Sequence, residues 1–229
     1  MHIPDGYLGP PTYLAAYTVC VPLWAYAAKK VRAAFSAERI PLLAIASAFS
    51  FLVMMFNIPL PGGSSGHAVG AVLIALLLGP WGAALAISIA LAIQALLFGD
   101  GGITAFGANC LNMAFVMPLT GAAVYGLLRG ATRTRRARAI VAGVAGWLGL
   151  TAGAFTTAVM FGLQPLLHHT ADGRALYAPY PLSVAVPVMV LQHLLFFGVI
   201  EGLLTALVVY ALEGATGAAG SRLHSGRLA

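Results

Sequence analysis

Seven long runs of apolar residues follow one another along the chain, separated by short segments that carry most of its charges. A helix that spans a bilayer needs about 20 predominantly apolar residues, so the pattern predicts an all-α polytopic membrane protein of about seven transmembrane helices. We expect a single transmembrane domain over residues 1–213 and a flexible tail, rich in glycine and alanine, over residues 214–229. The runs are Thr12–Ala28, Ile40–Phe56, Ala68–Leu78, Gly82–Leu97, Ala108–Leu128, Ile140–Leu163 and Leu182–Leu212.

The third run is the shortest, and the Gly79-Pro80-Trp81-Gly82 segment after it predicts a tight turn at the membrane surface rather than a kink. Composition supports a membrane protein, because 60% of the 229 residues are hydrophobic and only 8% are charged. Soluble globular domains carry roughly 25% charged residues. Cys20 and Cys110 lie inside apolar runs, which excludes a disulfide framework or a paired-cysteine metal site and predicts packing roles.

The positions of the basic residues predict the orientation in the membrane. With the N-terminus outside and the C-terminus in the cytoplasm, 11 of the 12 basic residues lie on the cytoplasmic side and only Arg174 lies outside. The formal charge of +6 therefore reflects topology and does not indicate a nucleic-acid partner. The first run is followed, not preceded, by positive charge, so it does not fit a cleavable signal and we expect Met1 to be retained. The outer face then holds Asp5, Asp100, Asp172, His2, His67, His168 and His169, an arrangement that attracts cations but that ordinary solvated loops also explain.

The chain starts Met1-His2-Ile3-Pro4-Asp5, which places an imidazole at the second position. The α-amine of Met1, the deprotonated amide of His2 and Nδ1 of His2 are able to close two fused chelate rings on one metal ion. Such rings hold their nitrogens nearly in one plane, and square-planar nitrogen coordination suits Ni²⁺ and Cu²⁺, whereas Zn²⁺ prefers a tetrahedron. The start of the chain therefore predicts a metal site that needs one further nitrogen.

His67 is expected to supply that nitrogen, because it ends a glycine-rich outer loop whose backbone permits close approach. A solvated side chain is the usual state of a lone surface histidine, but the chelating second position favours a ligand here. Ser64 and Ser65 are expected to donate hydrogen bonds around the site. Asp5 is expected to hold an imidazole N–H and so to fix its tautomer.

Four motifs carry a resemblance to a known family: Met-His-Ile-Pro-Asp-Gly at the start, Pro-Gly-Gly-x-Ser-Gly-His before the short run, Leu-Leu-Gly-Pro-Trp after it, and Gly107-Ala108-Asn109 before Asn112-Met113. From Met1 to about Glu213 the chain resembles the CbiM/NikM family, the substrate-capture subunits of energy-coupling-factor transporters for nickel and cobalt in prokaryotic cell (inner) membranes. The resemblance implies a square-planar site formed by Met1, His2 and His67.

The resemblance also implies partners. Ala44 and Ala48 have the small-x-x-x-small spacing that lets helices approach closely in lipid; the spacing alone favours packing within the chain, whereas the family implies that they face a transmembrane coupling subunit. An ATPase pair is expected to drive transport, and the chain contains no P-loop motif of its own. The family leaves open whether a small accessory membrane subunit takes part.

The sequence limits the choice of metal ion but does not decide it. Family members assigned to nickel tend to continue Met-His-Ile with Pro-Asp-Gly, as here, whereas many cobalt members have Met-Glu-Gly, so we expect nickel before cobalt. Affinity rises from Co²⁺ through Ni²⁺ to Cu²⁺, so Cu²⁺ is expected to bind in vitro. The metal is a transported ligand, and no catalytic cofactor is expected.

Several polar residues lie within or beside apolar runs. His193 and Glu201 in the last run are too far apart along a helix to pair, and each is expected to have another partner, either in function or in helix packing. Asn109 and Asn112 share one helical face and are expected to brace the N-terminal segment rather than to cap a loop. His168 and His169 are expected to lie in a solvated loop rather than to collect metal.

A membrane enzyme is the alternative from another class. Gly63-Ser64-Ser65-Gly66 fits the Gly-x-Ser-Gly of rhomboid-type intramembrane serine proteases, with His193 as the candidate base. A serine–histidine pair must approach within about 3.2 Å, and His193 lacks the surroundings usual in that class. We therefore expect a transporter subunit and not an enzyme.

Overall fold

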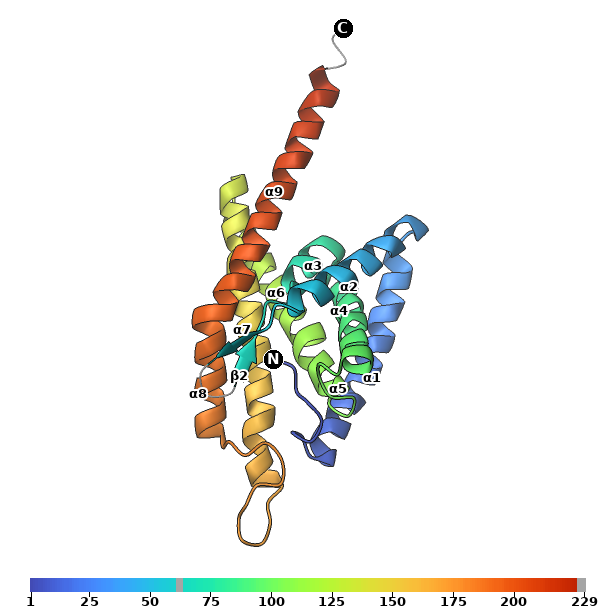
Figure 1. Cartoon of the computed structure of the whole chain (residues 1–229). Coiled ribbons are helices and arrows are strands. Elements are labelled where there is room, and N and C mark those ends of the chain that lie inside the picture. The colour runs from blue at the N-terminus through green and yellow to red at the C-terminus, as the bar shows by residue number, and fades with distance from the viewer. Residues whose placement is uncertain (61–63, 226–229) are drawn as a thin grey trace.

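The computed structural model describes the backbone of residues 1–60 and 64–225, which form seven helical rods packed side by side (Figure 1). Each of the seven apolar runs contains a helix, so the prediction of an all-α fold is confirmed. The elements are α1 (Pro10–Ala34), η1 (Ala37–Arg39), α2 (Ile40–Met54), β1 (Ile58–Leu60), β2 (Ser64–Gly66), α3 (Ala71–Leu78), α4 (Pro80–Ile93), η2 (Gln94–Phe98), α5 (Phe106–Asn109), η3 (Cys110–Val116), α6 (Met117–Leu128), η4 (Arg129–Ala131), α7 (Arg135–Leu167), α8 (Leu182–Gln192), η5 (His193–Phe197) and α9 (Gly198–Ser225).

The rods differ in their capacity to cross a bilayer. Among the described residues, five segments are long and apolar enough to span: Ala37–Met54, Pro80–Phe98, Phe106–Leu128, Arg135–Leu167 and Leu182–Ala215. Helix α1 has 25 residues, but its prolines, tyrosines and tryptophan make it less apolar. Helix α3 has 8 residues, a length of about 12 Å against a hydrocarbon core of about 30 Å. The chain is thus a multi-pass membrane protein in which the third run forms a short internal helix.

The connection on either side of α3 explains why this helix is short. It ends at Leu78 and α4 begins at Pro80, with Gly79 at φ 79°, so the predicted tight turn is present. Before α3, strands β1 and β2 form an antiparallel hairpin that pairs Ile58 with Gly66, a feature that the apolar pattern did not predict. The hairpin lies beside α8 in Figure 1.

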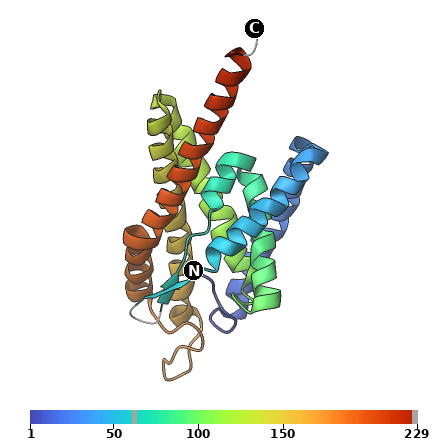
Figure 2. The same cartoon turned by 45° about the horizontal axis from the view of Figure 1, so that its top comes forward.

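Helices α7 and α9 form the most closely packed pair, and they run alongside each other in both Figure 1 and Figure 2. A methyl group on Gly143 would lie 2.9 Å from the carbonyl oxygen of Gly202, and one on Gly202 would lie 2.8 Å from that of Gly143. Small residues at a helix interface allow this approach in lipid. At the end of the pair, Arg138 Nε lies 2.8 Å from Glu213 Oε1, and the Arg135 guanidinium lies 3.6 Å from the Tyr210 ring centroid.

Helix α2 presents Ala44 and Ala48 outward, because both side chains are exposed. The helix packs inward through Ala46, Ser47, Ser50 and Met54. The expectation that the two alanines serve packing within the chain was wrong, since the inward face of α2 is the opposite one. Their role toward a partner stays a prediction.

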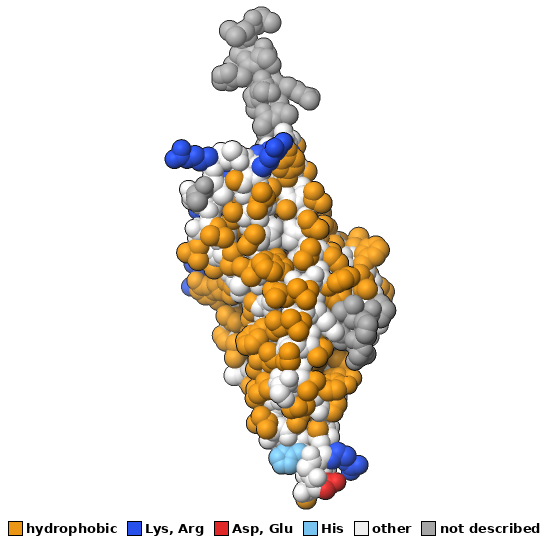
Figure 3. All heavy atoms as spheres, turned by 90° about the vertical axis from the view of Figure 1, so that its left-hand side faces the viewer, with side chains coloured by type: hydrophobic (Ala, Val, Ile, Leu, Met, Phe, Trp, Pro, Cys, Tyr) orange, Lys and Arg blue, Asp and Glu red, His pale blue; other side chains and the backbone are white. Residues whose placement is uncertain are grey.

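The surface has the character expected for lipid contact. Hydrophobic side chains form a broad belt in Figure 3, basic side chains gather at one end, and a few charged and histidine side chains lie at the other. Which end faces the cytoplasm stays a prediction. Helix α9 continues to Ser225 in the described backbone, beyond Glu213 where the flexible tail is expected; the flexibility of residues 214–229 is likewise untested.

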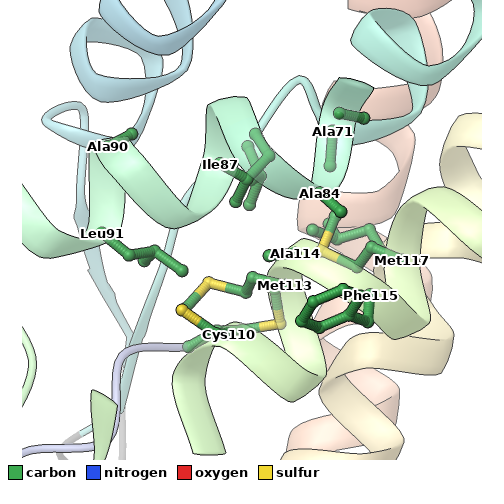
Figure 4. Close-up of a cluster of buried hydrophobic side chains, with 14 of the residues drawn as sticks. Ala71, Ala84, Ile87, Ala90, Leu91, Cys110, Met113, Ala114, Phe115 and Met117 are labelled. Carbon is green, nitrogen blue, oxygen red and sulfur yellow. The ribbon is translucent and has the colours of Figure 1, made fainter. Parts of the chain in front are cut away.

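Sulfur-containing and aliphatic side chains fill the centre of the bundle. In Figure 4, Cys110 and Met113 lie near Leu91 of α4, with Met117 further along the same rod. Both cysteines are free and buried, as the packing role requires, and Cys20 Sγ donates to the Gly107 carbonyl at 3.1 Å. This core separates α1 from the hairpin and leaves the N-terminus at the middle of the molecule (Figure 1).

Candidate metal centre

The first nine residues fold back into the bundle before α1 begins. Ile3 is fully buried, and the side chain of Met1 joins the hydrophobic cluster at the centre. The irregular backbone of this segment needs hydrogen-bond partners, because no water replaces them in the interior. Asn109 provides two of them: Ile3 N donates to its Oδ1 at 2.8 Å, and its Nδ2 donates to Ile3 O at 3.1 Å.

Further along, the segment is fastened to three other parts of the chain. Gly102 N donates to Ile3 O at 2.8 Å, Gly9 N donates to Gln164 Oε1 of α7 at 2.8 Å, and Ala178 N donates to Tyr7 O at 3.1 Å. The N-terminal segment is therefore an ordered part of the fold, and it places Met1 and His2 at a defined position.

Asp5 does not hold an imidazole, contrary to expectation. Its carboxylate accepts hydrogen bonds from Ile103 N at 3.1 Å, from Thr104 N at 2.8 Å and from the Thr104 hydroxyl. These bonds, that from the Thr104 hydroxyl foremost, lower the pKa of Asp5. Asp5 fails to reach the rings because Pro4 and Gly6 turn the chain outward, and it fixes the segment to the loop before α5 instead.

The two predicted imidazole ligands meet. The rings of His2 and His67 are stacked, with centroids 4.7 Å apart and planes inclined by 23°. His67 is 1% exposed, and its Nδ1 lies 2.9 Å from the carbonyl oxygen of Ala68. A carbonyl only accepts, so Nδ1 carries the proton and Nε2 keeps a free lone pair. Nε2 has no hydrogen-bond partner in the described structure.

Burial keeps the nitrogens of this site in the form that binds metals. It lowers the pKa of the Met1 amine to about 6. It also lowers the pKa of His67 well below the usual value, and nearby positive charge on the amine and on His2 adds to that shift. Burial lowers the pKa of His2 as well, with Asp100 and Gln94 partly opposing the shift. At neutral pH these groups therefore present lone pairs rather than protons.

Asp100 is the acidic neighbour of His2. Its Oδ1 lies 3.2 Å from His2 Nδ1, within ion-pair distance, although neither ring nitrogen of His2 has a well-formed hydrogen bond among the described residues. The interaction with His2 lowers the pKa of Asp100. A carboxylate at this place stabilises positive charge on whatever occupies the site.

In the described part of the chain, no three His, Cys, Asp or Glu side chains converge in a way that could hold a metal ion. The candidate donors of this site are therefore two side chains, those of His2 and His67, together with two backbone nitrogens, the Met1 amine and the His2 amide.

The similarity to known proteins extends over nearly the whole chain. A family profile described as the cobalt uptake substrate-specific transmembrane region, CbiM, matches residues 2–217. The chain belongs to the CbiM family. A fused nickel transport protein NikMN of Rhodobacter capsulatus is 54% identical over 214 residues, which cover 93% of this chain and 62% of the relative. A probable fused nickel transport protein LarMN of Lactiplantibacillus plantarum is 47% identical over 210 residues, covering 91% and 63%.

The chain thus spans about three fifths of the length of these two relatives. A crystal structure described as a truncated transition metal transporter matches with a TM-score of 0.90 at 48% identity, over 94% of this chain and 99% of that one. Both the fold and the family are therefore shared with proteins named for metal transport.

Other predicted residues of this CbiM-family chain lie apart from the metal centre. Asn112 Nδ2 donates to Thr157 Oγ1 of α7 at 2.9 Å and does not brace the N-terminal segment, which corrects that expectation. The chain becomes π-helical at Cys110, so Asn109 and Asn112 do not share the face that an α-helix would give them. Ser64 and Ser65 lie in β2, but their side chains fall outside the described residues. His169 is exposed, whereas the His168 ring packs on Gly9 and Tyr177.

Sequence reasoning missed Gln94, and it placed Asp100 on the outer face without its contact to His2. Gln94 is fully buried at the start of the π-helical segment η2. Neither its Nε2 nor its Oε1 has a hydrogen-bond partner among the described residues. A glutamine inside an apolar run was a visible signal. Asp100 offered no such signal, since a loop aspartate is ordinarily solvated.

His193 and Glu201 do not pair with each other, as expected. The His193 ring donates from Nδ1 to Met189 O at 2.7 Å and lies 5.2 Å from the Phe197 ring, centroid to centroid. Glu201 accepts hydrogen bonds from Val69 N at 2.8 Å and Gly70 N at 3.0 Å. Each has the separate partner that its buried position requires.

Proposed function

We propose that this chain captures a divalent transition-metal ion, nickel before cobalt, as the substrate-binding membrane subunit of an energy-coupling-factor transporter. One observation carries the proposal: two stacked imidazoles, from His67, which is 1% exposed, and from His2, whose side chain is 6% exposed, near a buried terminal amine. No ordinary packing need brings these polar groups together in a core, because each costs desolvation energy unless it gains a partner. A metal ion is the partner that suits three lone pairs.

In the proposed complex the metal is the transported substrate, and its donors are the Met1 amine, the His2 amide, His2 Nδ1 and His67 Nε2. Capture of a divalent ion releases the amide proton and whatever protons the amine and rings still carry. Asp100 offsets the remaining positive charge beside His2. Asn109 and Asp5 hold the segment that carries the first three donors.

Nickel is favoured because a square plane of nitrogens suits Ni²⁺ and because both relatives described above are named for nickel. The family description names cobalt, which keeps Co²⁺ as the alternative substrate. Copper is expected to bind in vitro by the same order of affinities.

A transport role requires partners that this chain does not contain. Energy is proposed to come from an ATPase pair through a transmembrane coupling subunit, with the exposed Ala44 and Ala48 of α2 in that interface. The two relatives are named fused transport proteins and extend beyond the matched region, which supports assembly with further transporter parts. Their names also support a transporter subunit over the serine-protease alternative.

The test is a titration of the purified protein with Ni²⁺, followed by absorption in the visible range. We expect one equivalent to produce the yellow band of a square-planar nickel complex. His67→Ala is expected to lose the band and at least about 100-fold in affinity, because water replaces a fixed nitrogen donor. His169→Ala, which removes an exposed imidazole, serves as the matched control. Unchanged nickel binding by His67→Ala would falsify the proposal.

A further inference from the structure

Glu201 is a fully buried carboxylate in the first turn of α9. Its Oε2 accepts hydrogen bonds from the backbone N–H groups of Val69 and Gly70, at 2.8 Å and 3.0 Å. These two residues follow His67 almost directly and lead into α3. The carboxylate therefore contacts the segment that carries a candidate metal ligand and not the ligand itself.

Because this contact is buried, its hydrogen bonds matter energetically. A carboxylate removed from water is costly unless several donors satisfy it, and hydrogen bonds to a charged acceptor are about twice as strong as neutral ones. The N–H groups at the start of α3 lack partners within that helix and attract an anion. Oε2 of Glu201 thus satisfies the two N–H groups before α3, whereas Oε1 has no hydrogen-bond partner among the described residues.

The same backbone is held from the opposite side by α2. Ser50 Oγ donates to Val69 O at 2.8 Å, so Val69 is bonded through both its N–H and its carbonyl. Gly70 has φ 73°, a conformation that favours glycine, and a side chain there would lie 2.6 Å from the Phe49 ring. The backbone after His67 has little freedom between α2 and α9.

Glu201 is itself fixed by the close packing of α9 on α7. A methyl group on Gly146 would lie 3.2 Å from the Glu201 carbonyl oxygen, one turn from the Gly143–Gly202 contact. Trp147 Nε1 of α7 donates to Leu194 O in η5 at 2.7 Å. The anchor of the loop is therefore the rigid α7–α9 pair.

We propose that Glu201 is a positioning residue for metal capture: it holds the backbone after His67 so that Nε2 faces the N-terminal segment. This inference rests on the proposed function. A residue that served only helix packing would have no reason to place its carboxylate on the loop, and its loss would weaken the whole bundle rather than the metal site. The two roles predict different measurements.

The experiment compares the full-length wild-type protein with Glu201→Ala, Glu201→Gln and the control Thr205→Val. Thr205 is buried one turn further along α9, and its hydroxyl has no hydrogen-bond partner in the described structure. The readouts are the Ni²⁺ dissociation rate, from competition with a chelator, and hydrogen exchange of the Val69 and Gly70 amides without metal. Thermal unfolding of each variant serves as the reference for the bundle.

We expect Glu201→Ala to raise the dissociation rate at least about tenfold and to increase exchange at both amides, because two charge-assisted bonds are lost. Glu201→Gln keeps an acceptor without the charge, so an increase of about three- to tenfold is expected. Thr205→Val is expected to stay within about twofold of the wild type, because removing a buried hydroxyl without a partner is nearly neutral.

The His67→Ala variant separates the two proposals. If it loses nickel while Glu201→Ala and Thr205→Val behave alike in both readouts, the positioning role is overturned and the proposed function stands. If wild type and His67→Ala hold nickel equally, the proposed function fails and the positioning role fails with it. Should Glu201→Ala not fold, Glu201→Gln decides, and an unchanged dissociation rate in that variant overturns the inference.

Discussion

The N-terminal segment and the loop around His67 each bring one imidazole to the same place, but the protein holds them in different ways. The segment is bonded by a neutral amide, Asn109 of α5, and by the backbone of the loop before α5. The backbone after His67 is bonded by a carboxylate of α9 and a hydroxyl of α2. The two imidazoles therefore have different nearest supports, α5 for the N-terminal segment and α2 with α9 for the backbone after His67, although α7 contacts both the segment at Gly9 and helix α9.

This difference has a consequence for capture and release. Because the two imidazoles are attached to separate parts of the bundle, any displacement of α2 and α9 relative to α5 changes the distance between them without unfolding either one. We propose that release uses such a displacement, driven by the partner ATPases, in which the His67 loop moves away from Met1. The two halves of the proposed site also differ in their number of metal donors: the N-terminal segment supplies three nitrogens and the His67 loop supplies one.

The largest effect is expected from a change to the half with three donors. An alanine inserted before Met1 converts the amine into an amide and moves the new terminus away from the buried pocket of the Met1 side chain. We expect nickel affinity to fall by at least about 1000-fold, more than for His67→Ala, because the chelate itself is lost. Competition with a coloured chelator measures the loss, and a variant extended at Ala229 is the control. High-affinity binding by the N-terminally extended protein would contradict the role of the amine.

A smaller effect is expected when the donors stay but their support is removed. Asn109→Ala deletes two buried hydrogen bonds to Ile3, and we expect nickel affinity to fall about 10- to 100-fold. Asn112→Ala is a matched control one turn away, since it deletes a bond to Thr157 and leaves the segment untouched. It should lower the temperature of unfolding with little change in affinity. Equal losses of affinity in the two variants would show that Asn109 has no specific role in holding the segment.

The smallest effect is expected on the other half, where Glu201 remains as an anchor. Ser50→Ala removes one neutral hydrogen bond to Val69 O, and we expect nickel to dissociate about twofold faster. Ser47→Ala is the matched control, because this buried hydroxyl donates to Leu43 O within α2. Stopped-flow release into a chelator resolves such differences. If Ser50→Ala speeds nickel dissociation more than Glu201→Gln does, Ser50 and not Glu201 is the more important anchor of the backbone after His67.

Much of the candidate site was accessible from the sequence because its chemistry is local. Met1 and His2 are adjacent, so their chelating capacity needs no tertiary information, and His67 stands out as a histidine in a glycine-rich loop. Asn109 was expected at the segment and contacts it. Asp5 and Asn112 were assigned to the wrong contacts, because Asp5 lies in a turn and Asn112 in the π-helical segment η3, and composition does not reveal the direction of a side chain in such backbone.

The contacts that the sequence did not specify share one property: the two partners lie far apart in the chain. Glu201 and Val69 are separated by 132 residues, and Ile3 and Asn109 by 106. Gln94 and Asp100 face His2 only because η2 and the loop after it end beside the N-terminal segment. Nothing in their own neighbourhood distinguishes them from a buried amide and a solvated acid.

The sequence by itself determined the seven helical runs and the potential chelating donors at the start of the chain. Helix formation in lipid must satisfy each segment's own backbone, and a chelate ring closes between neighbouring atoms, so both follow from adjacent residues. Tertiary structure alone decided that the two imidazoles stack and that α9 contacts the backbone after His67. These outcomes depend on which helices touch, and close packing of glycines and desolvation of charges, rather than local pattern, select those contacts.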